Sequence, residues 1–256
     1  MNLLSYTIKH FVIFITLFLI YSCDKHPDYV SKISGKEIHI TDSLKSVDSI
    51  ENFIKPYRSH INDVLDEALA YSPEALSKSD GELNTAIGNL LADIVMEQTN
   101  PVFKSRTGKN IDFVLLNHGG IRSIISKGNI TTRTAYQVMP FENKVVVVEI
   151  TTDKLQEMIN YLIKSNRAHP VSGIKIVLND NNSLQNVLVQ GKPIEKDKTY
   201  FVATSDYLSN MGDNMTFFSN PVSITETDYL IRNEMIDYFK KTDTIKPIID
   251  DRFIRL

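Results

Sequence analysis

A short apolar run at residues 112–116, Asp-Phe-Val-Leu-Leu, leads directly into the turn Asn-His-Gly-Gly-Ile-Arg at residues 117–122. The run predicts a buried strand. The two glycines let the backbone turn sharply at the end of this strand and come close to a ligand. The turn therefore supplies four candidate binding residues, Asn117, Gly119, Gly120 and Arg122.

Two side chains of this turn have the chemistry for binding a polar or anionic ligand. Asn117 both donates and accepts hydrogen bonds, which suits a base edge or a phosphate oxygen. Arg122 has a planar fork that matches a phosphate or a carboxylate. The simpler alternative is a tight turn followed by a surface arginine.

The rest of the chain mixes helical and strand patterns. We expect strands at residues 36–40, 145–150 and 200–205, and a hairpin formed by 174–178 and 184–189. We expect helices at residues 50–68 with a kink or a restart at Pro56, around 87–95, at 131–138, at 153–164, and at 229–240 after a capping box at Thr225 and Asp228. This mixture predicts an α/β fold of the mixed α+β kind, with layered helices and mixed sheets, rather than a doubly wound sheet.

The N-terminal segment reads as an export signal. Residues 1–22 carry an apolar run that is too short for a membrane span of roughly 20 apolar residues. The ending Ile-Tyr-Ser-Cys at residues 20–23 looks like a bacterial lipobox, so we expect lipidation at Cys23. The alternative is an uncleaved anchor with a free thiol.

This interpretation divides the chain into three parts. They are a lipoprotein signal peptide at 1–22, a lipidated Cys23 with its tether and first strand at 23–48, and a binding domain at 49–256. The expected location is extracytoplasmic, on the periplasmic face of a bacterial membrane or at the cell surface.

Composition excludes several other kinds of site. The formal net charge is −3 with no basic run, which argues against nucleic acid as a partner. A single cysteine rules out an intrachain disulfide and a thiolate-cage metal site.

Two further segments combine aromatic residues with turns. Phe141 follows Met-Pro after an expected helix, and residues 206–214 place Tyr207, Asn210, Gly212 and Asp213 after an expected strand. Two aromatic rings can hold a planar base between them, and a carboxylate can accept hydrogen bonds from ribose hydroxyls. Core packing is the ordinary role of either aromatic taken alone, and only the combination favours a nucleotide site.

Together, the motifs at residues 117–122, 139–141 and 207–213 resemble, in order and spacing, the C-terminal substrate-binding domain of the 5′-nucleotidase family. The resemblance covers residues 50–218 and implies a nucleotide-binding domain. It implies that Phe141 and Tyr207 stack on the base, that Asp213 holds the ribose, that Arg122 lies on the phosphate side, and that Asn117 contacts a polar edge of the ligand.

The chain departs from the family pattern at three places. The family usually has an arginine just before the Gly-Asn of an early helix, and residues 83–89 contain none. Met211 stands where the family usually has glycine, and Tyr207 stands where phenylalanine is common. We expect the loss of one phosphate contact and a narrower base pocket.

In this family a separate N-terminal metallophosphoesterase domain with two metals performs the hydrolysis. Its Asp-x-His motif does not occur in this chain, and His118 is expected to be a turn residue or a ligand contact. We therefore expect no catalytic residue, metal or cofactor here, and divalent metals only on a partner.

Three functions remain open at this point. The first is the nucleotide-binding half of a split hydrolase of the 5′-nucleotidase type, which acts with a separately encoded metallophosphoesterase. The second is a non-catalytic surface lipoprotein that binds nucleosides or nucleotides. The third is a degenerate family member with a structural or partner-binding role.

Overall fold

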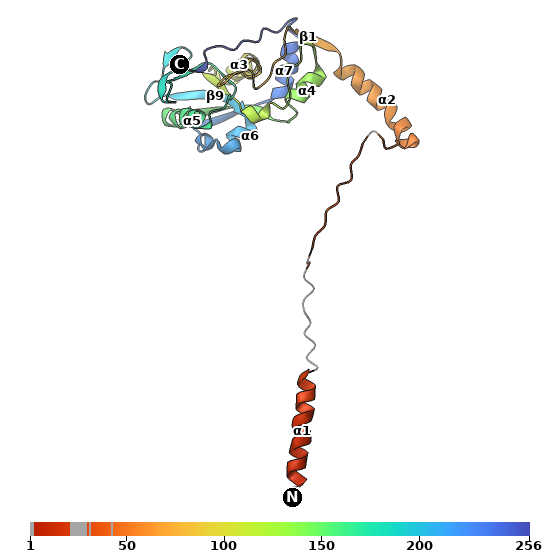
Figure 1. Ribbon diagram of the computed structural model, residues 1–256. Coiled ribbons are helices and arrows are strands. Elements are labelled where there is room, and N and C mark those ends of the chain that lie inside the picture. The colour runs from red at the N-terminus through yellow and green to blue at the C-terminus, as the bar shows by residue number, and fades with distance from the viewer. Residues whose placement is uncertain (1–2, 21–29, 31, 42) are drawn as a thin grey trace. The chain divides into compact units, whose positions relative to one another are not determined.

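The computed structural model describes residues 3–20, 30, 32–41 and 43–256 (Figure 1), and it divides into two units, residues 1–51 and 52–256. The first unit contains α1 (Leu3–Ile20). Among the described residues, no helix is long and apolar enough to span a membrane. Cys23 lies outside the described residues.

The strand expected at residues 36–40 is not formed. These residues are exposed and have no regular secondary structure. An alternating pattern makes a strand only where a neighbouring strand offers backbone hydrogen bonds. Further along, α2 (Asp48–Leu65) continues through Pro56 as one helix, so it does not restart there. It ends before residue 68, where β1 (Ala68–Ser72) begins, so the helix is shorter than predicted.

The central element of the second unit is a mixed five-stranded sheet. Its order is β10 (Ser223–Leu230), β4 (Lys144–Thr151), β9 (Thr199–Ser205), β2 (Phe113–Leu115) and β5 (Val171–Ser172). Only the pair β2 and β9 is parallel. The mixed fold class predicted from the sequence is confirmed.

The second unit also contains two smaller sheets. One contains β11 (Phe253–Arg255), β6 (Ile174–Leu178), β7 (Leu184–Val189) and β8 (Lys192–Pro193), and the hairpin of β6 and β7 is the predicted one. The other pairs β1 with β3 (Gly128–Thr131).

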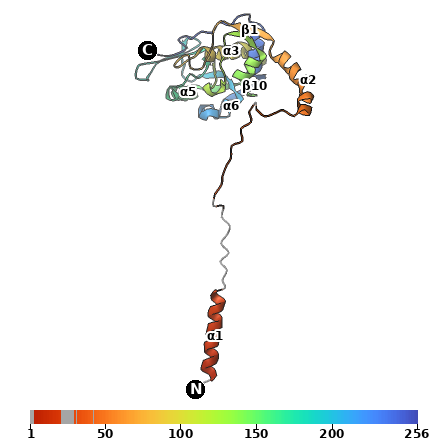
Figure 2. The ribbon, with the colours of Figure 1, turned by 45° about the vertical axis from the view of Figure 1, so that its right-hand side comes forward.

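Both faces of the five-stranded sheet are buried. Val145 and Val147 of β4 belong to one apolar cluster, whereas Val146 and Val148 belong to another. Successive side chains of a strand point to opposite faces, so this alternation places a core on each side of the sheet. α3 (Ala86–Thr107) packs on one side, and α5 (Thr152–Ser165) packs on the other (Figure 2).

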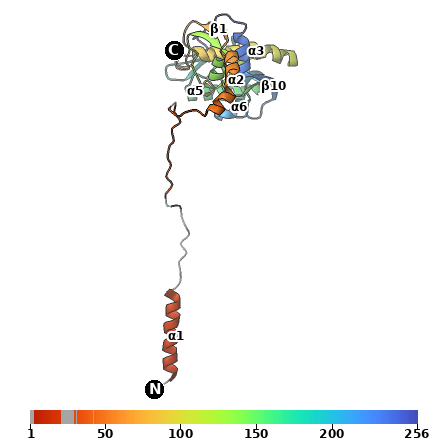
Figure 3. The ribbon, with the colours of Figure 1, turned by 90° about the vertical axis from the view of Figure 1, so that its right-hand side faces the viewer.

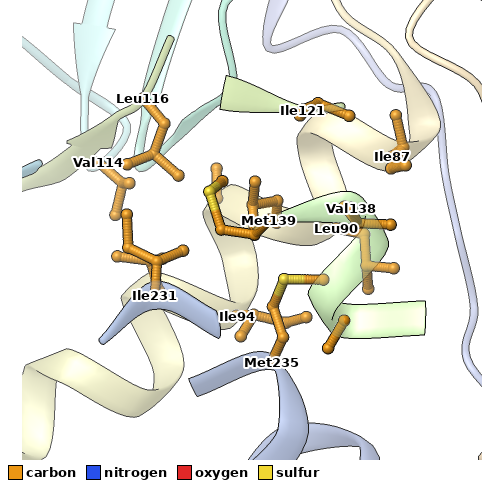
Figure 4. Close-up of a cluster of buried hydrophobic side chains, with 14 of the residues drawn as sticks. Ile87, Leu90, Ile94, Val114, Leu116, Ile121, Val138, Met139, Ile231 and Met235 are labelled. Atoms are coloured by element: carbon orange, nitrogen blue, oxygen red, sulfur yellow. The ribbon is translucent and has the colours of Figure 1, made fainter. Parts of the chain in front are cut away.

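The first core lies among α3, β2, β4, α4 (Thr132–Val138) and α7 (Ile231–Phe239). Figure 3 shows α3 and β10 from the side. Figure 4 shows how apolar side chains from these separate elements interdigitate, among them Ile94 of α3, Val138 of α4 and Met235 of α7. The second core includes Leu155, Met158, Ile159 and Leu162 of α5, and Ile163, also expected to face inward, is only partly buried against it.

The last helix begins later than predicted. Residues 223–230 form β10, and the capping box expected at Thr225 and Asp228 is absent. Thr225 pairs with Val147 of β4, so its backbone is committed to the sheet edge. Asp228 has a φ of 58° at an irregularity in this strand, and α7 starts only at Ile231.

A carboxyl group is buried between α3 and α7. Glu234 is fully buried, and its Oε1 accepts a hydrogen bond from the hydroxyl of Thr99. Its Oε2 has no partner among the described residues. Burial raises the pKa of Glu234 well above its ordinary value, and nearby Asp237 adds to this rise. The Glu234 carboxyl group therefore favours its protonated form more strongly than an exposed glutamate does.

Glu234→Gln is expected to raise the free energy of unfolding at pH 7.5. The folded-state pKa of Glu234 lies above that of the unfolded chain, so unfolding releases its proton once the pH exceeds the unfolded value. Stability therefore falls as pH rises from that value toward the folded-state pKa. Glutamine keeps the contact with Thr99 and does not titrate. Urea unfolding at pH 4.5, 6 and 7.5 measures the difference.

The control is Glu67→Gln, because Glu67 is exposed. We expect the Glu67 variant to follow the pH profile of the native protein. A Glu234→Gln variant with the native pH profile would contradict a raised pKa of Glu234.

Candidate functional site

The sheet topology brings three sequence motifs to one edge. Because β2 and β9 are parallel, their carboxyl ends lie at the same edge. β4 runs antiparallel to β9, so its amino end lies there too. Residues 117–122 follow β2, residues 139–143 precede β4, and residues 206–214 follow β9. The three loops therefore meet although they lie far apart in the sequence.

The loops enclose a cavity of about 400 Å³, which we call the first cavity. Seven of the predicted site residues line it, together with Asn143: Asn117, Gly119, Gly120, Arg122, Phe141, Tyr207 and Asp213. Asn210 and Gly212 instead line a more open hollow on the other side of Tyr207. Asn143 was not predicted because no motif marks it, and its position just before β4 is the only signal.

Asp213 is held by neutral hydrogen-bond donors from two other positions. Its Oδ2 accepts a hydrogen bond from Asn117 Nδ2 at 2.7 Å, and its Oδ1 accepts one from the Tyr207 hydroxyl at 2.9 Å. The Tyr207 oxygen in turn accepts from the backbone N–H of Asp213 at 3.1 Å. The carboxylate is thus fixed in direction with its remaining lone pairs available to a ligand.

These contacts explain why tyrosine, and not phenylalanine, is useful at position 207. Phenylalanine at position 207 would keep the ring but would lose both hydrogen bonds to Asp213. The hydroxyl therefore stabilises a loop in which Met211 has a φ of 65° and Asp213 a φ of 52°, both in the left-handed region.

Gly212 is required by the close approach of this loop to Tyr207. A Cβ at position 212 would lie 2.5 Å from the Tyr207 ring and 2.6 Å from its carbonyl oxygen. These contacts involve backbone and a packed ring, so no side chain fits. Gly212 thus shapes the cavity without lining it.

The loop that carries Phe141 is anchored by Arg232 of α7, which the sequence did not single out. The Arg232 guanidinium donates to the carbonyl oxygens of Pro140 and Phe141 at 3.2 and 3.3 Å, and it pairs with the Glu142 carboxylate. Its side chain is only 4% exposed and stacks on the Tyr136 ring at 4.1 Å. Arg232 is thus a positioning residue for Phe141.

Arg122 is exposed at the mouth of the first cavity. Its guanidinium lies 5.9 Å from the centre of the Phe141 ring and makes a long contact of 3.4 Å with the Gly119 carbonyl oxygen. In the described part of the chain it forms no ion pair with a carboxylate. Its charge is therefore available to an anion.

His118 is a turn residue, as the sequence suggested. It opens a short 3₁₀ turn, His118–Gly120, and its Nδ1 donates to the carbonyl oxygen of Ala168 at 3.2 Å. Burial lowers the pKa of His118, so its ring is uncharged at neutral pH. Among the described residues, no group of three or more His, Cys, Asp or Glu side chains could hold a metal ion.

Residues 83–89, where the arginine typical of the family is missing, lead into α3 and bind another segment of this chain. Asn84 Nδ2 donates to the carbonyl oxygen of Phe253 at 3.0 Å, and Asn89 Nδ2 donates to that of Ile248 at 2.9 Å. Both side chains are buried. The start of α3 therefore binds the C-terminal segment of the chain and does not line the first cavity.

Comparison with known proteins identifies the same family as the motifs. The family described as 5′-nucleotidase, C-terminal domain, matches residues 67–220, more than half of the chain. The cell wall protein Lmo0130 of Listeria monocytogenes is 27% identical over 224 residues, a match that covers 78% of this chain and 28% of that protein. Protein UshA of Escherichia coli is 29% identical over 147 residues, covering 55% of this chain and 26% of UshA.

A 5′-nucleotidase precursor from Thermus thermophilus has a similar fold, with a TM-score of 0.67 at 21% identity. That match covers 80% of this chain and 43% of the Thermus protein. The chain therefore spans between about a quarter and two-fifths of the length of these proteins. On the match over residues 67–220, the chain belongs to the 5′-nucleotidase C-terminal domain family.

Proposed function

We propose that this domain binds a nucleotide in the first cavity. The base would stack between Phe141 and Tyr207, the ribose hydroxyls would donate to Asp213, the phosphate would lie toward Arg122, and Asn117 would contact a polar edge. The observation that carries this proposal is that two exposed aromatics, an oriented carboxylate and an unpaired arginine line one cavity.

The chemistry of each wall supports this assignment. Stacking of a base on an aromatic ring contributes about 1–3 kcal/mol and tolerates different bases. The Asp213 oxygens accept hydrogen bonds, as ribose hydroxyls require. The Arg122 fork suits phosphate oxygens. Phe141 and Tyr207 are 42% and 45% exposed, so both rings offer surface to a ligand.

We further propose that hydrolysis of the bound phosphate ester depends on a separately encoded metallophosphoesterase that carries divalent metals. This chain corresponds to the C-terminal domain of its family and spans under half of the relatives it matches. In this arrangement the present chain supplies nucleotide binding, and its partner supplies the metals and the attacking water.

The exposed face of α2 is the proposed docking site for that partner. Phe53, Tyr57, Ile61 and Val64 lie along one side of the helix and are all more than half exposed. α2 ends at Leu65, directly before the matched region begins at residue 67. The remaining part of a longer relative precedes its C-terminal domain, so the α2 face lies at the junction where a phosphoesterase would sit.

We also propose an extracytoplasmic location with a lipid anchor at Cys23. Support comes from the lipobox-like sequence at residues 20–23 and from the similarity to a cell wall protein of Listeria.

A non-catalytic nucleoside-binding lipoprotein is the second candidate. It is favoured by one observation, namely that the start of α3 holds the C-terminal segment through Asn84 and Asn89 and leaves one phosphate contact of the family unfilled. The two candidates differ in whether the phosphate is recognised.

Calorimetric titration with AMP and with adenosine tests the binding proposal. We expect AMP to bind more tightly than adenosine because Arg122 is free to pair with the phosphate. Phe141→Ala should weaken AMP binding by a factor of about 5 to 150, which corresponds to the loss of about 1–3 kcal/mol of stacking.

The matched control is Tyr57→Ala, which removes an exposed aromatic ring outside the first cavity. It should leave AMP binding unchanged. Equal affinities for AMP and adenosine would favour the non-catalytic candidate, and a folded protein that binds neither would contradict both candidates.

Reconstitution tests the partner proposal. A mixture of this protein with a purified metallophosphoesterase from the same organism and a divalent metal is expected to release phosphate from AMP faster than the phosphoesterase alone. Ile61→Asp should abolish the gain because it puts a charge on the α2 docking face. Ser59→Asp, on the opposite side of the helix, should keep it. A mixture no faster than its separate components would refute the split enzyme.

A further inference from the structure

A second cavity of about 440 Å³ adjoins the first and shares Gly119 and Asp213 with it. Its other walls include His118, His169 and Arg167. The hydrogen bond from Asn117 Nδ2 to Asp213 Oδ2 therefore lies between the two cavities. The function proposed above uses only the first.

His169 lies in the wall of the second cavity. The residue is 4% exposed, and its Nδ1 accepts the backbone N–H of His118 at 3.3 Å. An imidazole that accepts at Nδ1 carries its proton at Nε2, and this Nε2 has no partner among the described residues. Burial lowers the pKa of His169 to about 4, so the ring is neutral at physiological pH. A buried donor without a partner is unfavourable, and an acceptor in the cavity would offset this cost.

The charges around the second cavity favour an anion. Arg167 is exposed, and its guanidinium makes no ion pair or hydrogen bond in the described part of the chain. It lies near enough to lower the pKa of both His118 and His169, and Lys78 acts on His118 in the same direction. The one acidic group in the wall is Asp213, and both of its oxygens already accept hydrogen bonds, from Asn117 and Tyr207.

We propose that the second cavity is a subsite for a phosphoryl group carried on the 2′ or 3′ oxygen of the ribose. This inference rests on the proposed function, in which the ribose hydroxyls meet Asp213. Because Asp213 borders both cavities, a substituent on one of those oxygens extends into the second cavity while the other hydroxyl still donates to the carboxylate. There the phosphoryl oxygens would meet the Arg167 guanidinium and the His169 Nε2–H. The ligand class is a nucleotide with phosphates on both sides of the ribose.

Titration with adenosine 3′,5′-bisphosphate and with AMP tests this subsite. We expect the native protein to bind the bisphosphate at least tenfold more tightly than AMP. Arg167→Gln should remove this advantage and leave AMP binding unchanged, because Arg167 lines only the second cavity. Lys164→Gln, a nearby exposed cation on α5 outside both cavities, should retain the native preference.

A second measurement separates the subsite from the nucleotide proposal. Inorganic phosphate alone should shift the imidazole resonances of His169 in the native protein and not in Arg167→Gln. A phosphate-dependent shift in a protein that binds no nucleotide would support the anion site and refute the nucleotide proposal. Binding of AMP without preference for the bisphosphate would overturn the subsite, whether or not free phosphate shifts His169.

Discussion

The central constraint on this domain is that the middle strands of its main sheet are buried on both faces. Most residues of β4, β9 and β2 belong to one of the two apolar cores. Such strands have no room for ligand-binding side chains along their length, because a polar group there would need a buried partner. Ligand-binding side chains are therefore confined to the strand ends. The one parallel pair of the five-stranded sheet, β2 with β9, brings the two loops that contain glycine turns to the same edge.

At that edge, the Asp213 carboxylate organises the site. Asn117 reaches it from the loop after β2, Tyr207 reaches it from the start of its own loop, and the Tyr161 hydroxyl of α5 donates to the Asp213 carbonyl oxygen at 2.9 Å. Three separate segments thus converge on one residue whose backbone is in the left-handed region. Since Asp213 borders both cavities, a ligand that moves it in one cavity also changes the wall of the other.

The site residues that could be predicted are those that lie close to one another in the sequence. Residues 117–122 and 207–213 each gather their polar and aromatic groups within a few positions of one another, and seven of the nine predicted residues line the first cavity. Arg232 could not be found in this way. It lies 91 residues from Phe141, in a helix whose pattern explains it equally well as a surface arginine, and only the packing of α7 against α4 brings it to the loop.

The error at residues 223–230 has a similar origin. A capping-box pattern is a local signal, whereas the pairing of Thr225 with Val147 depends on a strand edge that lies far earlier in the sequence. Backbone hydrogen bonds along an open sheet edge outweigh a single cap, whose contribution is about 0.5–2 kcal/mol. The strand predicted at residues 36–40 fails for the opposite reason, because its alternating residues meet no edge at all.

The same dependence on distant packing connects the buried carboxyl group to the binding loop. Glu234 and Arg232 lie two residues apart on α7, one bonded to Thr99 of α3 and the other to the carbonyl oxygens of the Phe141 loop. The contact between Glu234 and Thr99 joins α7 to α3, and burial at this contact raises the pKa of Glu234. The position of α7 in turn sets where the Arg232 guanidinium lies, and so where Phe141 stands in the cavity wall. The geometry of the proposed stacking face therefore depends on how α7 packs against α3.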